Sequence, residues 1–362
     1  MQISYSSFEK FQTCPRMWYL HYKEKIRPDS TSSAFFFGTA VGTIWQSLVL
    51  TKKESLTQQE KKDIELSKTP KESFRNLMYN IDLEGKRIPP TDPRVQYFKG
   101  DYDGELLQSP DWEKIDAYAQ ELGQVLPDGR LVSFEDLIDR YPSNLLDSDI
   151  QYLNLHFFLS LCRKGEMMID SFQKDILPNI VKVHAIEKAI KIDLSLETDK
   201  PMTDYLIGYL DMKVDYLVND EKLAEKLGLQ VGSVVTVLFD NKTSSARYSS
   251  KCLEEKPQLN IYQFAENTKY IGYIVGVKEI KRPERGDRKG ETFADIQVVI
   301  GEASEEISNQ VLDGVNAMLD GIAKKEFPMN TDTCDRCYGR PCVYRDYCKS
   351  GNMAGLIDKK KS

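Results

Sequence analysis

The sequence has few histidines, no long apolar run and no excess of basic residues. Only three of its 362 residues are histidine, and the formal net charge is −7. The apolar stretches at residues 35–50 and 156–162 are too short or too interrupted to span a bilayer. No apolar signal segment follows Met1, so we expect a cytoplasmic protein with no membrane partner. Because the chain is acidic, any nucleic-acid site must be a local basic groove rather than a whole face.

Cysteine is also sparse, but its positions are informative. Five of the seven cysteines lie near the two ends of the chain: Cys14 near the start, and Cys334, Cys337, Cys342 and Cys348 near the end. A chain of this length does not need the disulfide framework of a small secreted domain. Four thiolates suit an iron–sulfur cluster, and they suit a structural zinc ion equally well. Spacing alone leaves both open, and either group would join the two ends of the chain.

The sequence divides into four parts. Residues 1–50 have helix-like spacing of aromatic residues, and residues 51–177 read as a mainly helical, polar insertion. Residues 178–325 are rich in β-forming runs, whereas residues 326–362 carry the late cysteines and a basic tail. The tail ends in KKKS, which we expect to be disordered. No internal repeat is present, and 41% hydrophobic residues are enough for a sizeable core.

Five runs after Pro178 predict strands. In chain order they read VKVHAIEKAIKIDL, YLIGYLDMKVDYLV, SVVTVLFDNKTSS, YIGYIVGVKEI and ADIQVVIG. Pro257–Asn267, between the third and fourth runs, has a helical pattern, and Glu302–Lys325 predicts a final amphipathic helix. We therefore expect an α/β fold in which helices flank the sheet.

Three polar residues of the predicted sheet could act together. Asp240 and Lys242 stand two apart at the end of VVTVLFDNK, so they project from one face of the strand. Asp211 stands at the turn or start of the strand LDMKVDYL, and it joins them if the two strands pair. Two carboxylates and a lysine suit phosphodiester hydrolysis with a hard cation. The alternative is a strand that simply leaves the sheet through a polar turn.

The order of several motifs resembles one nuclease family. GxxD at Gly208–Asp211, DxK at Asp240–Lys242 and QxxxY at Gln258–Tyr262 follow one another between the CPR at Cys14 and the late cysteines. This resembles the PD-(D/E)XK nuclease superfamily, in its RecB-like iron–sulfur branch with the AddB and CRISPR-associated adaptation nucleases. SYSSFEKFQTCPRMWYLHY and FFFGTAVG also look like that branch, and residues 51–177 are unmatched. The resemblance implies a restriction-endonuclease-like mixed sheet whose chain ends are joined by a cysteine-ligated cluster.

The resemblance also implies roles for the residues of the predicted sheet. Asp211 and Asp240 would be the carboxylates that bind Mg2+ or Mn2+, and the backbone carbonyl of Asn241 would be a further ligand. Lys242 would be the catalytic lysine. Gln258 and Tyr262, one helical turn apart, would contact the DNA backbone. From the pattern alone, that helix could instead pack the tyrosine into the core.

This sequence departs from the family at the metal site. Where relatives have a histidine after the FGTAV-type stretch, this chain has Gly42, and a carboxylate often found four residues later is Gln46. We expect a weaker metal site, or one ion rather than two. Glu187, on the strand before Asp211, is the candidate for a compensating acid, although its default reading is an exposed strand carboxylate.

The cysteine spacing is irregular as well. Cys342 and Cys348 match the last interval of C-x2-C-x5-C, but the residue three positions before Cys342 is a glycine. The resemblance therefore implies a 4Fe-4S cluster held by Cys14, Cys342 and Cys348 with either Cys334 or Cys337, and zinc stays the alternative.

The sequence predicts a Mg2+- or Mn2+-dependent deoxyribonuclease. We expect an exonuclease that acts on DNA ends or single strands in recombination, repair or replication, with a helicase or recombination partner. Basic and aromatic residues at 16–25 and a basic loop at Lys278–Lys289 could follow DNA, although the loop could equally be a solvated hairpin. One alternative is a catalytically silent iron–sulfur DNA-binding protein with the same fold. Another is a zinc-stapled protein whose acidic pocket is incidental.

Overall fold

The structure, a computed structural model, describes residues 2–28, 33–78, 161–194, 205–249, 251–280, 293–335, 337 and 341–360. Its strands are β1 (Gln2–Ser4), β2 (Ile26–Pro28), β3 (Ile180–Asp193), β4 (Tyr205–Val218), β5 (Ser233–Ser244), β6 (Tyr270–Ile280), β7 (Phe293–Glu302) and β8 (Leu356–Asp358). Its α-helices are α1 (Tyr5–Thr13), α2 (Pro15–Trp18), α3 (Ser33–Leu50), α4 (Gln58–Asp63), α5 (Pro70–Met78), α11 (Glu221–Leu227), α12 (Cys252–Glu255), α13 (Gln258–Glu266), α14 (Glu305–Ala323) and α15 (Arg345–Ser350). Shorter 3-10 and π-helical turns are η1 (Tyr19–Lys23), η2 (Ile64–Ser67), η3 (Phe172–Ile176), η4 (Leu177–Asn179) and η5 (Thr331–Thr333).

The five strands predicted after Pro178 are present as β3 to β7, and the two helices predicted in that region are α13 and α14. Alternation explains why the strand pattern was readable. In β4, every second side chain from Leu206 to Val218 is buried, as expected for a strand with period two. Over the described residues, no helix is long and apolar enough to cross a membrane.

The central sheet is mixed and contains a fork. Its order is β1-β4-β5-β6-β7, and β3 pairs with β4 along the opposite edge. On the remaining edge of β4, β1 pairs in parallel with Tyr205–Ile207, whereas β5 pairs antiparallel with Met212–Val218. Within the described part of the chain, residues 208–211 therefore have no strand partner on that edge. We call this opening between β1 and β5 the fork.

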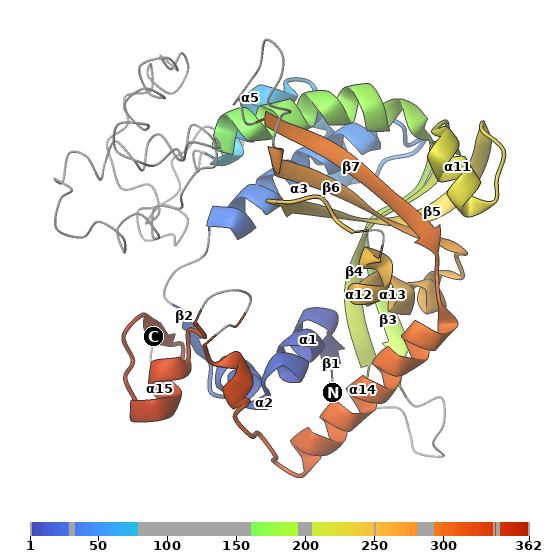
Figure 1. The fold of residues 1–362 in the computed structure, drawn as a ribbon. Coiled ribbons are helices and arrows are strands. Elements are labelled where there is room, and N and C mark those ends of the chain that lie inside the picture. The colour runs from blue at the N-terminus through green and yellow to red at the C-terminus, as the bar shows by residue number, and fades with distance from the viewer. Residues whose placement is uncertain are drawn as a thin grey trace, which may run out of the picture.

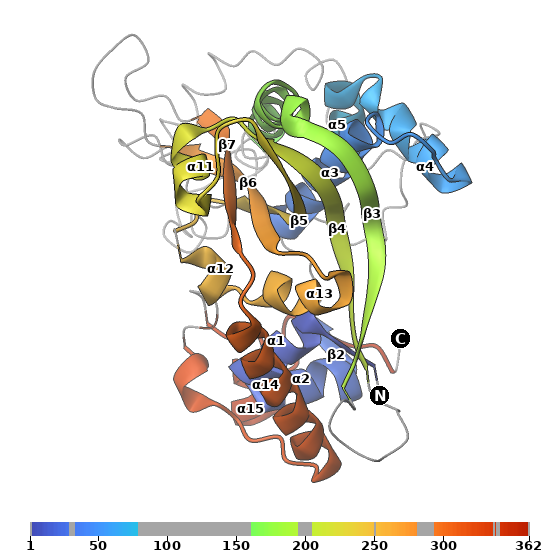
Figure 2. The same cartoon turned by 90° about the vertical axis from the view of Figure 1, so that its right-hand side faces the viewer.

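Helices cover both faces of the sheet (Figures 1 and 2). On one face, α3 and residues 161–172 pack against β4 and β5 through a core that includes Trp45, Phe172 and Phe239. On the other face, α1, α13 and α14 pack against the sheet through a second core that includes Tyr262 and Val315. Because β5 and β6 are parallel, the chain must cross over between them, and this crossover places α13 beside the end of β5.

The early and late parts of the chain meet away from the sheet. β2 pairs antiparallel with β8, and a third, small core joins Cys14, Met17 and Leu20 to Tyr344 and Leu356. The expectation of a disordered KKKS tail was wrong for its first two residues. The backbone of Lys359 donates to the Lys25 carbonyl at 3.1 Å, and Lys360 forms a 3.0 Å ion pair with Glu24.

Two further differences from the sequence expectations concern the early strands and the position of Asp211. Residues 1–50 were expected to be helical, yet Gln2–Ser4 and Ile26–Pro28 are strands. These segments are too short for a pattern, and their partners lie far away in the chain. Asp211 lies inside the 14-residue strand β4 rather than at a turn or strand start. Most of the predicted insertion (79–160) and most of the basic loop (281–292) lie outside the described residues.

Candidate active site

Asp240 and Lys242 lie on one face of β5, as predicted from the period of a strand. The Lys242 Nζ is 2.5 Å from Asp240 Oδ2, and the aspartate side chain is almost fully buried. Leu238, two residues earlier, belongs to the core beneath α13, so this face of β5 points toward α13. Burying an aspartate with a single ammonium partner costs free energy, so packing alone does not explain this ion pair.

Asp211 reaches the same place from β4. Beyond the pair formed by Met212 and Phe239, the β4–β5 register would set Asp211 opposite Asp240. The backbone pairing of β4 with β5 ends before this pair. Instead, the Asp211 side chain bonds to β5, because its Oδ2 accepts a hydrogen bond from the backbone N–H of Asn241 at 2.6 Å. The fork is therefore held open by a side chain, with two carboxylates at its apex.

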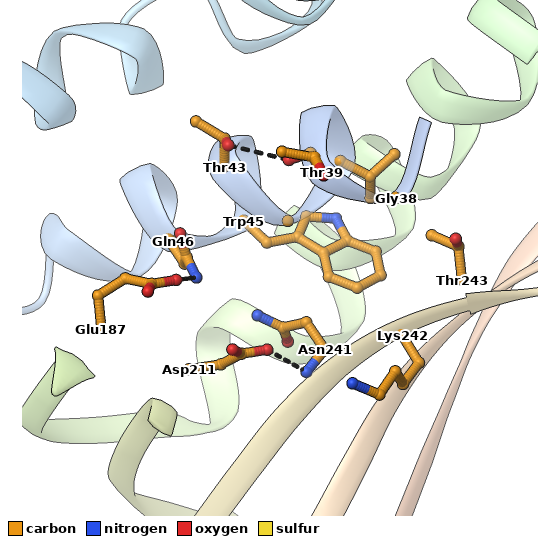
Figure 3. Close-up of a pocket in the computed structure, with 12 residues that line it drawn as sticks. Gly38, Thr39, Thr43, Trp45, Gln46, Glu187, Asp211, Asn241, Lys242 and Thr243 are labelled. Atoms are coloured by element: carbon orange, nitrogen blue, oxygen red, sulfur yellow. Dashed lines mark hydrogen bonds between the residues drawn. The ribbon is translucent and has the colours of Figure 1, made fainter. Parts of the chain in front are cut away.

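A third carboxylate continues the row across the sheet. Glu187 lies opposite Asp211 in the β3–β4 register, between two regular pairs. Its φ of 47° is uncommon for a residue other than glycine. Gln46 on α3 donates a hydrogen bond to the Glu187 carboxylate (Figure 3). Glu187, the predicted compensating acid, is thus hydrogen-bonded to Gln46, which stands where relatives often have a carboxylate.

Burial and mutual repulsion set the protonation of these groups. Burial, followed by the charge of Asp240, raises the pKa of Asp211 to about 7, and Glu187 adds to the rise. Burial also raises the pKa of Asp240, against the opposing attraction of Lys242. For Lys242, burial would lower the pKa, but its attraction to Asp240 outweighs burial and raises it. The lysine is therefore charged, and the carboxyl pair attracts either a proton or a cation.

Glu187, Asp211 and Lys242 line one cavity between α3 and the sheet, with a volume of about 430 Å3 (Figure 3). Asp240 is paired with Lys242 but is not part of the cavity wall. We call it the acidic pocket; its wall includes Gly42, Glu187, Asp211, Asn241 and Lys242. A Cβ atom added at Gly42 would meet no heavy atom within 4 Å, so helix packing does not require glycine there. The Asn241 side-chain amide is buried and has no hydrogen-bond partner among the described residues.

Gln258 and Tyr262 lie on the other side of the fork. The Gln258 amide donates to the Tyr262 hydroxyl at 3.2 Å, and the ring of Tyr262 is buried in the core. Both line a second cavity that also includes Lys242. The glycine of GxxD has a physical role here, because a Cβ on Gly208 would lie 2.2 Å from the Tyr262 oxygen. Tyr262 therefore packs into the core, as the alternative interpretation predicted, and it also lines a cavity that includes Lys242.

The structure brings the five terminal cysteines together as free thiols. Burial, then Cys342 and Cys14, raise the pKa of Cys337 to about 11, which requires these sulfurs to lie close to one another. Burial raises the pKa of Cys348, and Cys342, Cys14 and Cys334 raise it further. The backbone N–H of Cys342 donates to the Cys334 carbonyl at 2.8 Å. Cys14, Cys337, Cys342 and Cys348 pack in the third core, and Cys334 adjoins them through its backbone hydrogen bond to Cys342, so neither Cys334 nor Cys337 is excluded as a ligand. We call these five residues the cysteine group.

Neither cluster is arranged as a closed site for a single ion. Across the part of the chain that the structure describes, no three or more histidine, cysteine, aspartate or glutamate side chains are grouped so as to hold one metal ion. The donor types nevertheless fit two different groups: carboxylate and amide oxygens in the acidic pocket suit a hard cation, and thiols suit iron or zinc.

Sequence reasoning missed two features of the site. The hydrogen bond between Gln46 and Glu187 joins residues 141 positions apart, and no local sequence pattern predicts such a contact. The gap in the pairing of β4 was also missed, because it depends on β1. One signal for β1 was present in the sequence: the apolar Ile3 stands just before Ser4, which caps helix α1, and Ile3 is fully buried.

One comparison bears on the class of protein that this fold and these carboxylates resemble. The family model described as the PD-(D/E)XK nuclease superfamily matches residues 2–139. The resemblance to this superfamily is therefore confirmed, and the mixed sheet with flanking helices fits its restriction-endonuclease-like fold. The match ends before Asp211, so it bears on the family and not on the site residues. The iron–sulfur branch stays a prediction.

Among particular proteins, fourteen solved chains match. SSO0001 is 14% identical, with 68% of this chain and 98% of that chain covered and a TM-score of 0.27. A protein from Eubacterium rectale, described as a candidate exonuclease, is 11% identical, with 82% and 99% covered and a TM-score of 0.28. No curated protein matches the chain. Likenesses at this level carry no argument about geometry or activity.

Proposed function

We propose that this chain is a metal-dependent deoxyribonuclease that hydrolyses DNA from ends or in single strands. The observation that carries the proposal is the apex of the fork, where Asp211 and Asp240 from two strands adjoin the ammonium group of Lys242. Such a group of charges is costly to bury for stability alone, and perturbed carboxyl pKa values mark functional sites. A role in recombination, repair or replication beside a helicase belongs to the same proposal.

The acidic pocket fits a Mg2+ or Mn2+ ion. Asp211, Asp240 and the backbone carbonyl of Asn241 would hold it, and a bound cation would offset the burial and the Asp240 charge that raise the pKa of Asp211. When bound, the ion would polarise the scissile phosphate and lower the pKa of a water molecule. The unpartnered Asn241 amide offers a further oxygen close to Asp211. Glu187 is less available, because Gln46 already donates to it.

The side chains of the chain itself position the phosphate. Lys242 lines both cavities, so its ammonium group can donate hydrogen bonds to phosphate oxygens between them. Asp240 holds that ammonium in place through a buried ion pair. In hydrolysis, the oxygen of a water molecule bonds to phosphorus as the bond to a sugar oxygen breaks, and the departing oxygen takes up a proton. Stabilising charge on the phosphoryl group is the main contribution expected of these residues.

The cysteine group belongs to the proposal as a structural element. Its thiols come from both ends of the chain and crowd one another, which supports a shared metal group in preference to five unrelated cysteines. Each cysteine of a 4Fe-4S cluster binds a different iron atom, so its sulfurs lie further apart than the ligands of one zinc ion. We propose such a cluster, with zinc as the alternative. Its role is to fix the ends rather than to transfer electrons.

A cleavage assay tests the proposal. The purified protein, kept free of oxygen, is incubated with end-labelled linear DNA or with circular single-stranded DNA, in Mg2+ or Mn2+. We expect degradation that needs the metal and that the Asp240→Asn variant, prepared in parallel, does not show. Cleavage of linear but not circular DNA supports the exonuclease assignment. A wild-type protein that binds DNA but does not cleave it favours the silent DNA-binding protein instead.

A further inference from the structure

A second cavity of about 470 Å3 shares Lys242 with the acidic pocket. Its wall is drawn from β1, α1, β4, α13 and β6, together with the segment after β5. Aromatic side chains dominate it, and we call it the tyrosine pocket after Tyr5, Tyr209, Tyr248, Tyr262 and Tyr273. Tyrosine rings in proteins are usually buried or hydrogen-bonded, so five of them around one open cavity suggest a binding site.

The tyrosines fall into two groups. Tyr262 and Tyr273 are 3% and 1% exposed, and their hydroxyls are satisfied by Gln258 and by the Lys256 carbonyl. They form the floor of the cavity. Tyr5 and Tyr248 are half-buried, whereas Tyr209 is 62% exposed. These three rings have faces that a ligand could cover.

The pocket exists because the sheet is open at the fork. Ser4, at the end of β1, forms one border, and Gly208 and Tyr209 belong to the stretch of β4 that lacks a partner. Since a Cβ on Gly208 would collide with Tyr262, that glycine also keeps the floor in place.

The charge of the pocket suits an anionic ligand with an aromatic part. Lys256 lies with its Nζ 4.9 Å from the centre of the Tyr248 ring, and Lys242 lies at the border with the acidic pocket. Glu9 is the one acid among the residues that line this pocket. Two ammonium groups can bind phosphate, and the exposed ring faces can stack on a base.

We propose that the tyrosine pocket binds one unpaired nucleotide of a DNA strand next to the scissile phosphate, with its base stacked on Tyr209. The proposal rests on the nuclease function above, because Lys242 is what places the phosphate between the two cavities. A cavity of this volume is within the roughly 300–1,000 Å3 of small-ligand sites, which is enough for one nucleotide and too little for a base pair with its backbone. The strand must therefore be unpaired at the cleaved bond.

Equilibrium binding tests this without relying on turnover. The full-length protein in a chelator-containing buffer is titrated into a fluorescent single-stranded oligonucleotide, a set of single-abasic versions and a blunt duplex. Tyr209→Ala is compared with Tyr209→Phe, which keeps the ring. Phe264→Ala is the matched control, because Phe264 is an exposed aromatic residue of α13 that lines neither cavity.

We expect Tyr209→Ala to weaken single-strand binding about 5- to 100-fold, as expected for one stacked base, and to leave duplex binding unchanged. Tyr209→Phe should stay close to wild type. One abasic position should weaken wild-type binding by a similar factor, and Tyr209→Ala should cause no further loss on that strand. Equal losses on duplex, no loss, or no single-strand binding by the wild type would each overturn the inference.

The two proposals fail separately. Base-dependent binding without any cleavage in Mg2+ or Mn2+ leaves the tyrosine pocket standing and removes the nuclease. Metal-dependent cleavage by a protein whose binding ignores Tyr209 and the abasic positions does the reverse.

Discussion

The acidic pocket and the cysteine group gather reactive side chains in different ways. Asp211 and Asp240 stand on long strands, each paired on its outer side with β3 or β6, and the β4–β5 ladder that ends one pair before them fixes their separation. The cysteines stand on turns and short helices, beside a two-stranded sheet of three residue pairs. Residues on regular elements keep their geometry without help, whereas residues on connecting segments need a cross-link. The pocket is therefore preorganised, whereas the cysteine group would depend on the metal proposed for it.

The two regions share one electrostatic property. Like groups are crowded in both, and crowding and burial raise the pKa of Asp211 to about 7 and that of Cys337 to about 11. A cation would remove this cost in either place. Without the cation, the acidic pocket should stay intact, whereas the cysteine group should loosen. Four experiments test this difference.

The largest effect is expected from Lys242→Ala. Losing the ammonium group should reduce DNA cleavage by at least roughly 10²–10³-fold, because charge stabilisation is the main catalytic contribution. The sheet should persist, with an unchanged circular dichroism spectrum. Lys269→Ala is the matched control, since this exposed lysine pairs with Glu302 on the surface. A Lys242→Ala enzyme with wild-type rates would remove the pocket from the mechanism.

Cys14→Ser should affect the other region. We expect the variant to lose most of the iron, about four atoms per chain in the proposed cluster, and to expose both ends to proteolysis while the sheet survives. Iron analysis and limited proteolysis with mass spectrometry measure the two effects. Cys252→Ser, at a buried cysteine far from the group, should keep its iron. One zinc per chain, with no iron or sulfide, would replace the cluster by a zinc site.

The acidic pocket should make the metal-free protein less stable as pH rises. The folded pKa of Asp211 is raised from 3.8 to about 7, so the folded state binds its proton more tightly than the unfolded state. Stability from this group is complete below pH 4 and is lost between pH 4 and 7. Asp211→Asn should therefore be more stable than wild type at pH 8, by up to about 4 kcal/mol, since one pKa unit is about 1.4 kcal/mol.

Asp215, four residues along β4, gives the control of opposite sign. Hydrogen bonds from Thr236 and His184 lower its pKa and outweigh its partial burial. Its contribution is present above pH 4 and is lost as pH falls through the folded pKa. Asp215→Asn should thus be less stable than wild type at pH 7. Thermal unfolding in a chelator over pH 4–8 compares the variants, and parallel curves for wild type and Asp211→Asn would contradict the burial of that charge.

The smallest effect is expected at Gly42. The open space beside it permits Gly42→His, which should lower the Mn2+ concentration for half-maximal cleavage by roughly tenfold, because imidazole suits softer ions better than Mg2+. Gly42→Ala fills the same space without a ligand and should leave the metal dependence unchanged. If the well-folded histidine variant matches Gly42→Ala, this position does not face the metal.

The sequence was informative wherever a local period decides the structure. The alternation in β4 and the apolar run in β5 predicted both strands, and the period of a strand put Asp240 and Lys242 on one face. The spacing in α13 likewise placed Gln258 and Tyr262 together, as their hydrogen bond shows. These features depend on neighbours within a few residues.

Features that depend on distant partners could not be read in this way. The fork needs β1 beside β4, two segments about two hundred residues apart in the chain. Glu187 was predicted as a compensating acid with an exposed strand carboxylate as the alternative; it is exposed, and its hydrogen bond from Gln46 on α3 could not be foreseen. Each such contact is one choice among many for a short segment, and sequence period carries no information about it.

The pairing of β1 with β4 also sets a timetable for synthesis. Gln2–Ser4 leave the ribosome some two hundred residues before their partners at Tyr205–Ile207, roughly 10–40 s at ordinary elongation rates. During that interval the apolar side chain of Ile3, which is fully buried in the finished fold, lacks the β4 strand that it pairs with. The border of the tyrosine pocket is thus made well before the strand that completes it.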